Sequence, residues 1–221
     1  MDHLLSKESG RPQSLPTVKP SERTEPTDQD QLRKRPVSGD SLEGHGPRLN
    51  DAAPFFWYNN TAMNDMDIAA RVVAAMAAKG KTCATAESCT GGGVGFAITS
   101  VAGSSAVYLG GVVSYSNSVK ASLLGVSTET LASVGAVSSE VAGQMAAGAR
   151  RVTGADFAVS LTGIAGPGGG SAEKPVGLVW FGLATPDGVE TESRVFSGDR
   201  AQVRAAAVEH ALGLLLAAVE R

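Results

Sequence analysis

The stretch that decides the fold is KTCATAESCTGGGVGFAITSV, which runs from Lys81 to Val101. It opens with a short apolar segment typical of a strand and closes with a segment whose spacing predicts a helix. Between the two, Ser88, Cys89 and Thr90 place a hydroxyl, a thiol and a second hydroxyl directly before three glycines. A buried strand does not choose such residues, and an ordinary loop needs fewer glycines. The arrangement suits a nucleophile on a tight turn between a strand and a helix.

Strands and helices alternate along the rest of the chain, and the expected elements are as follows. Helices are expected over 66–80, 93–101, 138–154 and 199–221, with a short helix around Lys120, and strands over 81–86, 108–116, 155–163, 176–185 and 188–198. The alternation predicts an α/β domain, a layered sheet with helices on its faces. The last two strands, joined at Pro-Asp-Gly, predict a hairpin and therefore a mixed sheet rather than a purely parallel one. Ser138 or Ser139 and Asp199 stand where helix caps are expected.

The first part of the chain differs in composition from the rest. Seven of the ten prolines fall there, mixed with serine and charged residues. Such a segment buries too little apolar surface to offset a chain entropy of about 1–2 kcal/mol per residue. We therefore expect a disordered extension over 1–62, in which PFFWY at 54–58 could dock on a surface, and one globular domain over 63–221. The alternative is that translation begins at Met63 or Met66 and the upstream residues are an artefact.

Composition narrows the class of protein. The chain has 221 residues, 43% hydrophobic and 19% charged, in the range of soluble globular proteins. A net charge of -3 and a pI near 5.6 give no reason to expect a nucleic-acid partner. No run of 18 apolar residues predicts a membrane span, and the charged N-terminus is not a secretory signal. Cys83 and Cys89 lie in one segment, which argues against a disulfide scaffold and favours a cytoplasmic setting.

The sequence lacks the residues that several common kinds of catalytic and binding site require. The only histidine after residue 62 is His210, inside an apolar helix, so a triad with serine or cysteine is not predicted. A nucleophile elbow needs glycines where Ala86 and Thr90 stand. The glycine loop at 163–170 lacks the Gly-Lys-Ser/Thr ending of a phosphate loop, and neither glycine cluster fits a dinucleotide fingerprint. No cluster of ligands predicts a metal site.

Lysine is the remaining candidate base, and the domain has four of them. Lys79 and Lys81 flank a helix end, where cations face solvent and complement the helix dipole. Lys174 borders the glycine loop, at the rim. Lys120 follows Tyr115 in YSNSVK, at the expected mouth of the sheet. Spacing alone leaves open whether Lys120 is a base or a surface lysine.

A serine hydroxyl becomes a good nucleophile when a neighbouring base takes its proton, and a desolvated lysine can be that base. Ser88, Tyr115 and Lys120 therefore form a coherent acyl-transfer site, with the tyrosine relaying the proton or holding the other two in register. Glycines after Ser88 would leave amide groups free at a helix N-terminus for an oxyanion. Thr162 and Gly163, at another strand end, are expected to line the same crevice.

Five motifs of this chain resemble those of one family. They are AESCTGG (86–92), GGVVSYSNSVKASLLGV (110–126), GAVSSEVAGQMAAGAR (135–150), SLTGIAGPGGG (160–170) and EKPVGLVW (173–180). Together they resemble the C-terminal domain of the competence/damage-inducible protein CinA, a family that includes nicotinamide-nucleotide amidohydrolases. The resemblance covers about 66–221, in order and without large gaps. It looks like the stand-alone form, without the larger N-terminal domain that CinA proteins often carry.

The resemblance implies a fold, a reaction and roles for particular residues. The fold is an α/β/α sandwich, assembled as homodimers or higher homo-oligomers, with no metal or organic cofactor. The reaction is hydrolysis of nicotinamide mononucleotide to nicotinate mononucleotide and ammonia, a step in pyridine-nucleotide recycling. Ser88 is the implied nucleophile, and Tyr115 and Lys120 are implied to activate it. Thr162 matches a position that holds the substrate amide or the developing oxyanion.

Two further groups complete the predicted site. Amides from Cys89, Thr90, Gly91 and Gly92, with Thr162 and Gly163, are expected to hold the oxyanion and the substrate. Arg200, at the start of the last helix, is our candidate for the substrate phosphate, because helix N-termini and guanidinium groups both favour phosphate. The alternative for Arg200 is an exposed arginine in a first helical turn.

Rival interpretations remain open at this point. Cys89 is the rival nucleophile, against a role as a small packing residue beside Ser88. Glu87 is either a residue that orients the site or a simple turn carboxylate. A catalytically silent module that binds a pyridine nucleotide or a protein is the alternative to an enzyme. A related amide or ester hydrolase with another substrate is the third reading.

Overall fold

The computed structural model describes the backbone of residues 61–221 and the side chains from Asp67 onward. The predicted extension over 1–62, with its PFFWY segment, lies outside the described residues except for Thr61 and Ala62, which begin a helix.

One five-stranded sheet organises the domain. The elements are α2 (Thr61–Ala78), β1 (Cys83–Glu87), α3 (Gly93–Thr99), the 3₁₀ turn η2 (Ser104–Ala106), β2 (Tyr108–Val113), α4 (Asn117–Leu124), α5 (Thr128–Val134), α6 (Ser139–Thr153), β3 (Phe157–Gly163), β4 (Leu178–Thr185), β5 (Gly188–Val195) and α7 (Arg200–Glu220). The strand order is β2-β1-β3-β4-β5. The first three strands of that order are parallel to one another, and β3, β4 and β5 are antiparallel neighbours.

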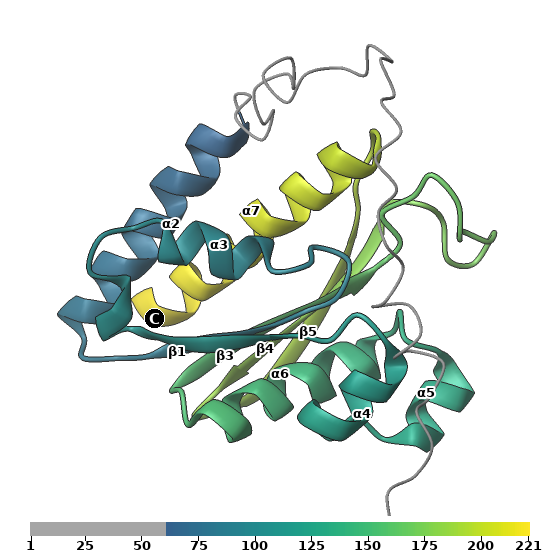
Figure 1. The fold of residues 1–221 in the computed structure, drawn as a ribbon, viewed down its shortest axis with the longest axis horizontal. Coiled ribbons are helices and arrows are strands. Elements are labelled where there is room, and N and C mark those ends of the chain that lie inside the picture. Colours follow the sequence, from purple (N-terminus) through teal and green to yellow (C-terminus); the bar gives the residue numbers. More distant parts are fainter. Residues whose placement is uncertain (1–60) are drawn as a thin grey trace, which may run out of the picture. The chain divides into compact units, whose positions relative to one another are not determined.

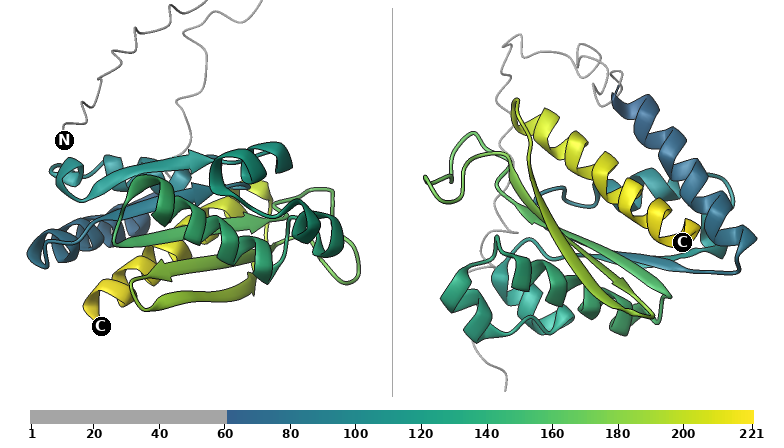
Figure 2. Two further views of the ribbon diagram at one scale, coloured as in Figure 1. Left: turned by 90° about the horizontal axis from the view of Figure 1, so that it is seen from below. Right: turned by 180° about the vertical axis from the view of Figure 1, so that it is seen from behind.

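Helices cover both faces of this sheet. The helices α2, α3 and α7 lie on one face, and α4, α5 and α6 lie on the other (Figure 1, Figure 2). The predicted sandwich with a mixed sheet is confirmed, including the terminal hairpin of β4 and β5. The parallel half is the half that can build a site, because the carboxyl ends of neighbouring parallel strands meet at one edge.

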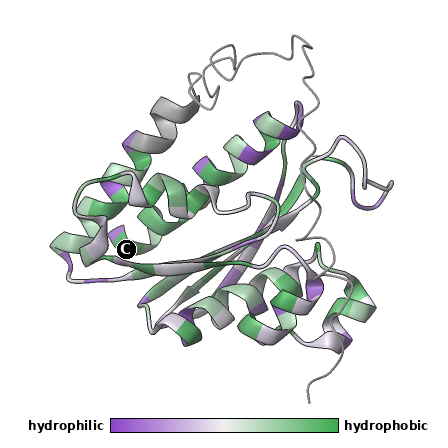
Figure 3. Ribbon diagram, viewed as in Figure 1, coloured by the Kyte–Doolittle hydropathy of each residue, from purple (hydrophilic) through white to green (hydrophobic). Residues whose placement is uncertain are grey.

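Two apolar layers hold the helices to the sheet. On one face Met76 of α2, Ile98 of α3 and Leu212 of α7 are fully buried against the strands. On the other, Met145 of α6 and Leu124 of α4 fill a smaller layer. Hydrophobic residues run along the helices that flank the sheet (Figure 3). Burial of this apolar surface is the main force that fixes the layers.

Helix ends follow the predicted signals. The Ser138 hydroxyl accepts the amide of Val141 at the start of α6, and Gly154 ends the same helix in a left-handed conformation. Asp199 begins α7 with a complete capping box. The helix α5 had no sequence prediction. Its cap is Ser127, whose hydroxyl accepts the amide of Thr130, and α5 buries no side chain fully.

The helix α7 is long and apolar enough, by length and composition alone, to cross a membrane. Half of its most apolar stretch is buried inside the domain. The buried side of α7 faces α2 and the sheet, with Val203, Leu212 and Leu215 fully covered. Its apolar character is therefore that of a helix in the core of this fold.

Candidate active site

The predicted nucleophile lies where three parallel strands end. Glu87, the last residue of β1, pairs with Val113 of β2 and with Leu161 of β3. The Ser88 amide donates to the Leu161 carbonyl (3.0 Å), so Ser88 leaves the sheet beside the end of β3. This register brings segments far apart in sequence to one edge of the sheet, as the sequence predicted.

Lys120 reaches this edge from the first turns of α4. The Ser116 hydroxyl caps that helix by accepting the Val119 amide, which turns the chain back after β2. The Lys120 side chain is 1% exposed, and its Nζ lies 3.1 Å from the Ser88 Oγ. The same nitrogen donates to the Ser114 carbonyl at 2.7 Å. The structure therefore brings together the serine and the lysine that the sequence singled out.

Burial alters the acid–base behaviour of Lys120. It lowers the pKa of the ammonium, because the charged form loses solvation, while the nearby Cys89 acts weakly in the opposite direction. None of the ion pairs in the described part of the chain includes Lys120. A buried amine without a carboxylate partner loses its proton more readily than a surface lysine does. Such an amine can accept the proton of Ser88.

Glu87 shapes the turn that follows β1. Its side chain is 1% exposed and accepts the hydroxyl of Thr90 at 2.7 Å. It also accepts the amides of Gly92 (3.0 Å), Val94 (3.2 Å) and Gly95 (2.9 Å) at the start of α3. A carboxylate thus occupies the amino end of this helix, where a negative charge is stabilised.

The predicted oxyanion donors differ in the hydrogen bonds that their amides make. The Gly92 amide is used by Glu87, and the Gly91 amide donates to the Ser88 carbonyl (3.1 Å). These two amides therefore help to close the turn. No backbone carbonyl in the described part of the chain accepts the amides of Cys89 and Thr90, which makes these two amides the candidates for an oxyanion. The Cys89 amide also contacts its own thiol.

Thr162 and Gly163 lie beside this turn, at the end of β3. The Thr162 side chain is buried, and its hydroxyl donates to the Ala136 carbonyl at 2.8 Å. With its proton used in this way, the Thr162 oxygen is an acceptor toward any further group. A Cβ on Gly163 would lie 2.7 Å from the Leu178 carbonyl oxygen, so only glycine fits this close approach of β3 to β4.

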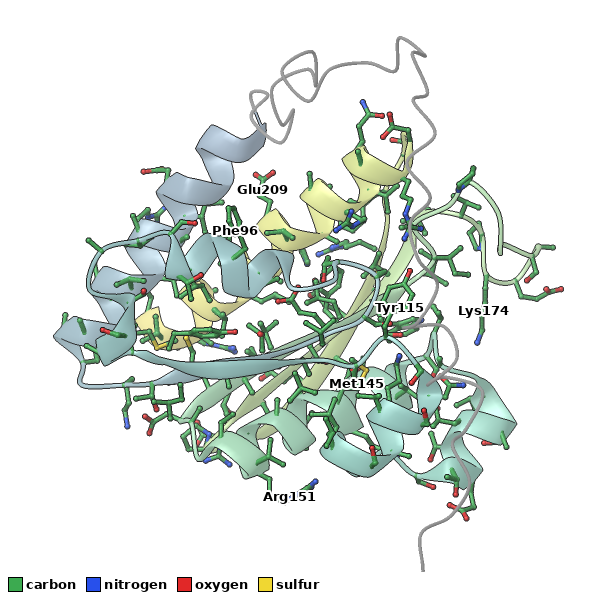
Figure 4. The ribbon with its side chains drawn as sticks, viewed as in Figure 1. Phe96, Tyr115, Met145, Arg151, Lys174 and Glu209 are labelled. Atoms are coloured by element: carbon green, nitrogen blue, oxygen red, sulfur yellow. The ribbon has the colours of Figure 1, made fainter. Side chains whose placement is uncertain are left out.

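Tyr115 and Arg200 form a separate contact at the mouth of the site. Tyr115 is 62% exposed, and its hydroxyl accepts Arg200 Nη2 at 3.1 Å. Arg200 Nη1 also donates to the Gly166 carbonyl at 2.9 Å. Figure 4 places Tyr115 and Lys174 toward the same end of the sheet. The structure thus joins Ser88 directly to Lys120, with Tyr115 outside that contact.

A cavity of about 470 Å³ opens beside Arg200. It is lined by Ala165, Gly166, Pro167, Val176, Gly198, Asp199, Arg200 and Ala201. The glycine loop after β3 and the first turn of α7 therefore enclose one hollow, and the only cation of its lining is Arg200. The predicted phosphate residue is in a position to serve a ligand there.

Three other candidate residues have contacts or surroundings that distinguish them from Ser88 and Lys120. Cys89 is buried, and burial raises the pKa of its thiol to about 11, so the thiolate is disfavoured. Lys174 Nζ donates to the Val134 carbonyl at 2.6 Å and ties the glycine loop to α5. His210 pairs with Glu192 of β5 and packs against the ring of Phe181.

Sequence reasoning missed one residue at the site. Arg204, one turn after Arg200 in DRAQVR, donates from Nη2 to the Thr90 carbonyl at 2.8 Å. It thereby connects α7 to the turn after β1, which carries Ser88 and is called the nucleophile turn below. The spacing of four residues from Arg200 is the signal that places both side chains on one face of α7. Among the described residues, no group of three or more potential metal ligands gathers anywhere.

Comparison with known proteins gives consistent matches. The model of the CinA C-terminal domain matches residues 65–219. Nicotinamide-nucleotide amidohydrolase PncC of Escherichia coli K12 is 53% identical over 151 residues, which are 68% of this chain and 92% of that protein. The PncC of Enterobacter agglomerans is 55% identical over 139 residues, 62% of this chain and 85% of its own length. A crystal structure of competence/damage inducible protein CihA from Agrobacterium tumefaciens superposes with a TM-score of 0.69 at 46% identity, covering 72% of this chain and 96% of that one.

The fold and the site define an α/β/α protein in which a buried lysine contacts a serine at the carboxyl edge of a mixed sheet. More particularly, the chain belongs to the CinA C-terminal domain family. The PncC relatives are matched over most of their own length.

Proposed function

We propose that this protein hydrolyses nicotinamide mononucleotide to nicotinate mononucleotide and ammonia, through a serine nucleophile and a lysine base. The observation that carries the mechanism is the 3.1 Å contact between Lys120 Nζ and Ser88 Oγ. Support for the substrate comes from the PncC relatives, whose name states that they act on nicotinamide nucleotides. A role in pyridine-nucleotide recycling and a cytoplasmic setting follow from the same relatives and belong to the proposal.

The first half of the reaction forms an ester on Ser88. Neutral Lys120 takes the hydroxyl proton while the Ser88 oxygen attacks the carboxamide carbon, which the pyridinium ring makes electrophilic. The tetrahedral intermediate then collapses, the C–N bond breaks, and the Lys120 ammonium gives its proton to the departing nitrogen, which leaves as ammonia. The contact of Lys120 with the Ser114 carbonyl holds the amine in place through both transfers.

The second half returns the enzyme to its starting state. Water attacks the acyl group, Lys120 accepts a proton from that water, and the ester bond to Ser88 breaks. The Ser88 oxygen recovers a proton from Lys120, and nicotinate mononucleotide leaves. One lysine thus serves as base and acid in turn, which fits a pKa lowered by burial.

The developing oxyanion needs donors next to Ser88. We assign this role to the amides of Cys89 and Thr90, because the amides of Gly91 and Gly92 are used inside the turn. Loss of one such donor typically costs about 10²–10³ in rate. Thr162, whose hydroxyl donates to Ala136, is suited to accept the N–H of the substrate carboxamide. An acceptor there favours the amide over the carboxylate product, which carries no N–H.

The substrate phosphate needs a cation, and we assign it to Arg200. Two of the five N–H groups of its guanidinium are used by Tyr115 and Gly166, which leaves donors for an anion in the adjoining cavity. Family resemblance implies that Tyr115 takes part in serine activation, and we propose a different role for it here because its hydroxyl contacts Arg200. Its hydroxyl orients Arg200, and the proton passes directly between Ser88 and Lys120.

Two other functions are alternatives to the hydrolysis of nicotinamide mononucleotide. A silent module that binds a pyridine nucleotide or a protein would need no buried, desolvated base beside Ser88. The burial of Lys120 beside Ser88 and the lowered pKa of its amine support the enzyme over this alternative. A related amide or ester hydrolase would use the same site with another substrate, and only substrate profiling separates it. We also propose one functional domain over 63–221 that works as a homodimer or higher homo-oligomer, needs no cofactor, and binds neither nucleic acid nor membrane.

Ammonia release from nicotinamide mononucleotide by the purified full-length chain, without added metal, tests the function. We expect turnover by the wild type and its loss in Ser88→Ala and Lys120→Ala. Lys81→Ala is the matched control. Lys81 precedes β1 and forms an ion pair with Asp156, which precedes β3, so this pair lies at the opposite end of the sheet from Ser88. Wild-type protein that binds the nucleotide but releases no ammonia would favour the silent module. Activity that survives Ser88→Ala and disappears in Cys89→Ala would move the nucleophile to the thiol.

A further inference from the structure

Glu87 is a buried charge that the mechanism above does not use. It is 1% exposed, and none of the ion pairs in the described part of the chain includes it. A buried carboxylate without a cation must be stabilised by hydrogen bonds, or it is costly to keep. Its neighbours in sequence and space are Ser88 and the nucleophile turn.

The contacts of Glu87 are all donors, and they are shared between its two oxygens. Oε2 accepts the Thr90 hydroxyl and the amides of Gly92 and Val94. Oε1 accepts the amide of Gly95. An uncharged amide side chain cannot reproduce this set, because its NH₂ group would face an N–H group. The site therefore requires a carboxylate rather than a polar group of the same shape.

These contacts fix the backbone on both sides of the nucleophile. Glu87 is the last residue of β1, and Ser88 is tied by its amide to Leu161. The carboxylate then reaches forward over the turn to hold Thr90 and the first turn of α3. The peptide planes of Cys89 and Thr90 lie between these hydrogen-bonded positions, which restricts the rotation of their amides.

We propose that Glu87 is a positioning residue for the acyl-transfer reaction: it holds the amides of Cys89 and Thr90 toward the oxyanion and the Ser88 oxygen toward Lys120. The inference deepens the proposed function and rests on its serine nucleophile. A second effect follows from the same contacts. Because the carboxylate fills the amino end of α3, no anion of the substrate or product can bind there and compete with the reacting position.

The chain offers a matched control for a carboxylate that caps backbone groups. Asp156, immediately before β3, accepts the amide (2.9 Å) and the hydroxyl (3.0 Å) of Thr82. Thr82 immediately precedes β1, so this pair lies at the opposite end of the sheet from Ser88. Asp156→Asn therefore removes a similar structural contact without touching the nucleophile turn.

Labelling of Ser88 by a fluorophosphonate tests the proposal independently of the natural substrate. The Ser88 oxygen attacks phosphorus, fluoride leaves, the serine proton passes to Lys120, and the phosphoryl oxygen takes the oxyanion position. The rate is followed by mass spectrometry of the intact full-length chain, with Ser88→Ala to show which residue is labelled. We expect Glu87→Gln to react at least tenfold more slowly than wild type and Glu87→Asp to recover part of the loss. Asp156→Asn should react at the wild-type rate, although we expect both Glu87→Gln and Asp156→Asn to lower the melting temperature.

The outcomes separate positioning from simple stability. A wild-type rate in folded Glu87→Gln overturns the proposal, and so does an equal loss of rate in Asp156→Asn. If circular dichroism shows that Glu87→Gln does not fold, Glu87→Asp decides: a slower rate in a native fold supports positioning, and an unchanged rate overturns it. A wild type that is not labelled at all removes the serine nucleophile and this proposal together. Labelled protein that does not hydrolyse the nucleotide removes only the proposed substrate.

Discussion

Lys120 Nζ lies 3.1 Å from Ser88 Oγ, although the two residues are 32 positions apart in the sequence. The contact joins the end of β1 to α4 and takes place in a setting where Lys120 is almost fully covered. Removing solvent from an amine lowers the free-energy cost of its neutral form relative to its charged form. The fold therefore lowers the pKa of this lysine in the way that the proposed role as a base requires.

Replacing Lys120 by arginine keeps the positive charge and removes the base. A guanidinium does not lose its proton in proteins, so it cannot accept one from Ser88. We expect kcat for ammonia release in Lys120→Arg to fall by about 10²–10⁴, the usual contribution of general base catalysis. Lys174→Arg, which alters a lysine that binds a backbone carbonyl, should stay within a few-fold of wild type. Equal activity of Lys120→Arg and wild type would contradict the assignment of the base.

The pH dependence of folding should carry the signature of Lys120. Its pKa is lowered in the folded state from the ordinary lysine value of 10.5, so between the two values the unfolded chain binds more protons than the folded one. The free energy of unfolding should therefore rise with pH through that window, which begins at the lowered pKa and closes near 10.5. Below this pH window the folded protein has to bury a charged ammonium, so the free energy of unfolding is lower there than above the window.

Urea titrations of wild type and Lys120→Met over this pH range make the measurement. The difference between the two proteins reports Lys120 together with its interaction with Cys89, because the burial of the Cys83 and Cys89 thiols acts in the opposite sense in both proteins. Their raised pKa values favour the folded state up to about pH 9 and progressively less above it. A difference that does not change with pH would show that Lys120 titrates normally. The same lysine predicts that kcat/KM rises with pH to a plateau reached below 10.5.

Arg200 should discriminate between substrates with and without a phosphate. We expect Arg200→Ala to raise KM for nicotinamide mononucleotide roughly tenfold, the effect of one charge-assisted hydrogen bond. The KM for nicotinamide riboside, which lacks the phosphate, should change little. Tyr115→Phe removes the hydroxyl that accepts from Arg200, and we expect it to raise KM with kcat retained. A loss of kcat in Tyr115→Phe as large as in Lys120→Arg would return Tyr115 to the path of the proton.

Gly163→Ala tests the close packing of β3 against β4 under the site. The new methyl group would lie 2.7 Å from the Leu178 carbonyl oxygen and 2.9 Å from the Val179 Cα, and backbone atoms cannot move aside easily. We expect the free energy of unfolding to fall by about 1–3 kcal/mol, as for other overpacked cores. Gly213→Ala in α7 is the control, because a Cβ there meets nothing within 4 Å. That change should be neutral or stabilising by about 0.5–1 kcal/mol.

The fold was accessible to sequence reasoning because its signals are local. Apolar segments bounded by glycines gave the strands, and Ser138, Gly154 and Asp199 marked helix ends that the structure has. The helix α5 escaped prediction because it buries none of its seven residues fully and so has no strong apolar period. A helix of that length depends on the surrounding contacts more than on its own sequence.

The site was predictable in its members and less so in its contacts. The sequence singled out Ser88, Lys120 and Arg200, but it could not show that the lysine reaches the serine without Tyr115. The turn hydrogen bonds of Glu87 were also out of reach, since they depend on the direction of one side chain across eight residues. Without them, the glycine amides after Ser88 looked free for an oxyanion. Long-range contacts of this kind are a property of the folded chain.

The hairpin of β4 and β5 has a practical consequence. The strand β4 leads away from the site end of the sheet and β5 leads back, which returns the chain to the point where Arg200 begins α7. The turn at Pro186 and Asp187 is therefore exposed at the far end, with the sheet between it and Ser88. A peptide tag or fluorescent label inserted there should leave turnover intact. The molecule thus carries an attachment point for immobilising it on a surface with its reactive edge facing the solution.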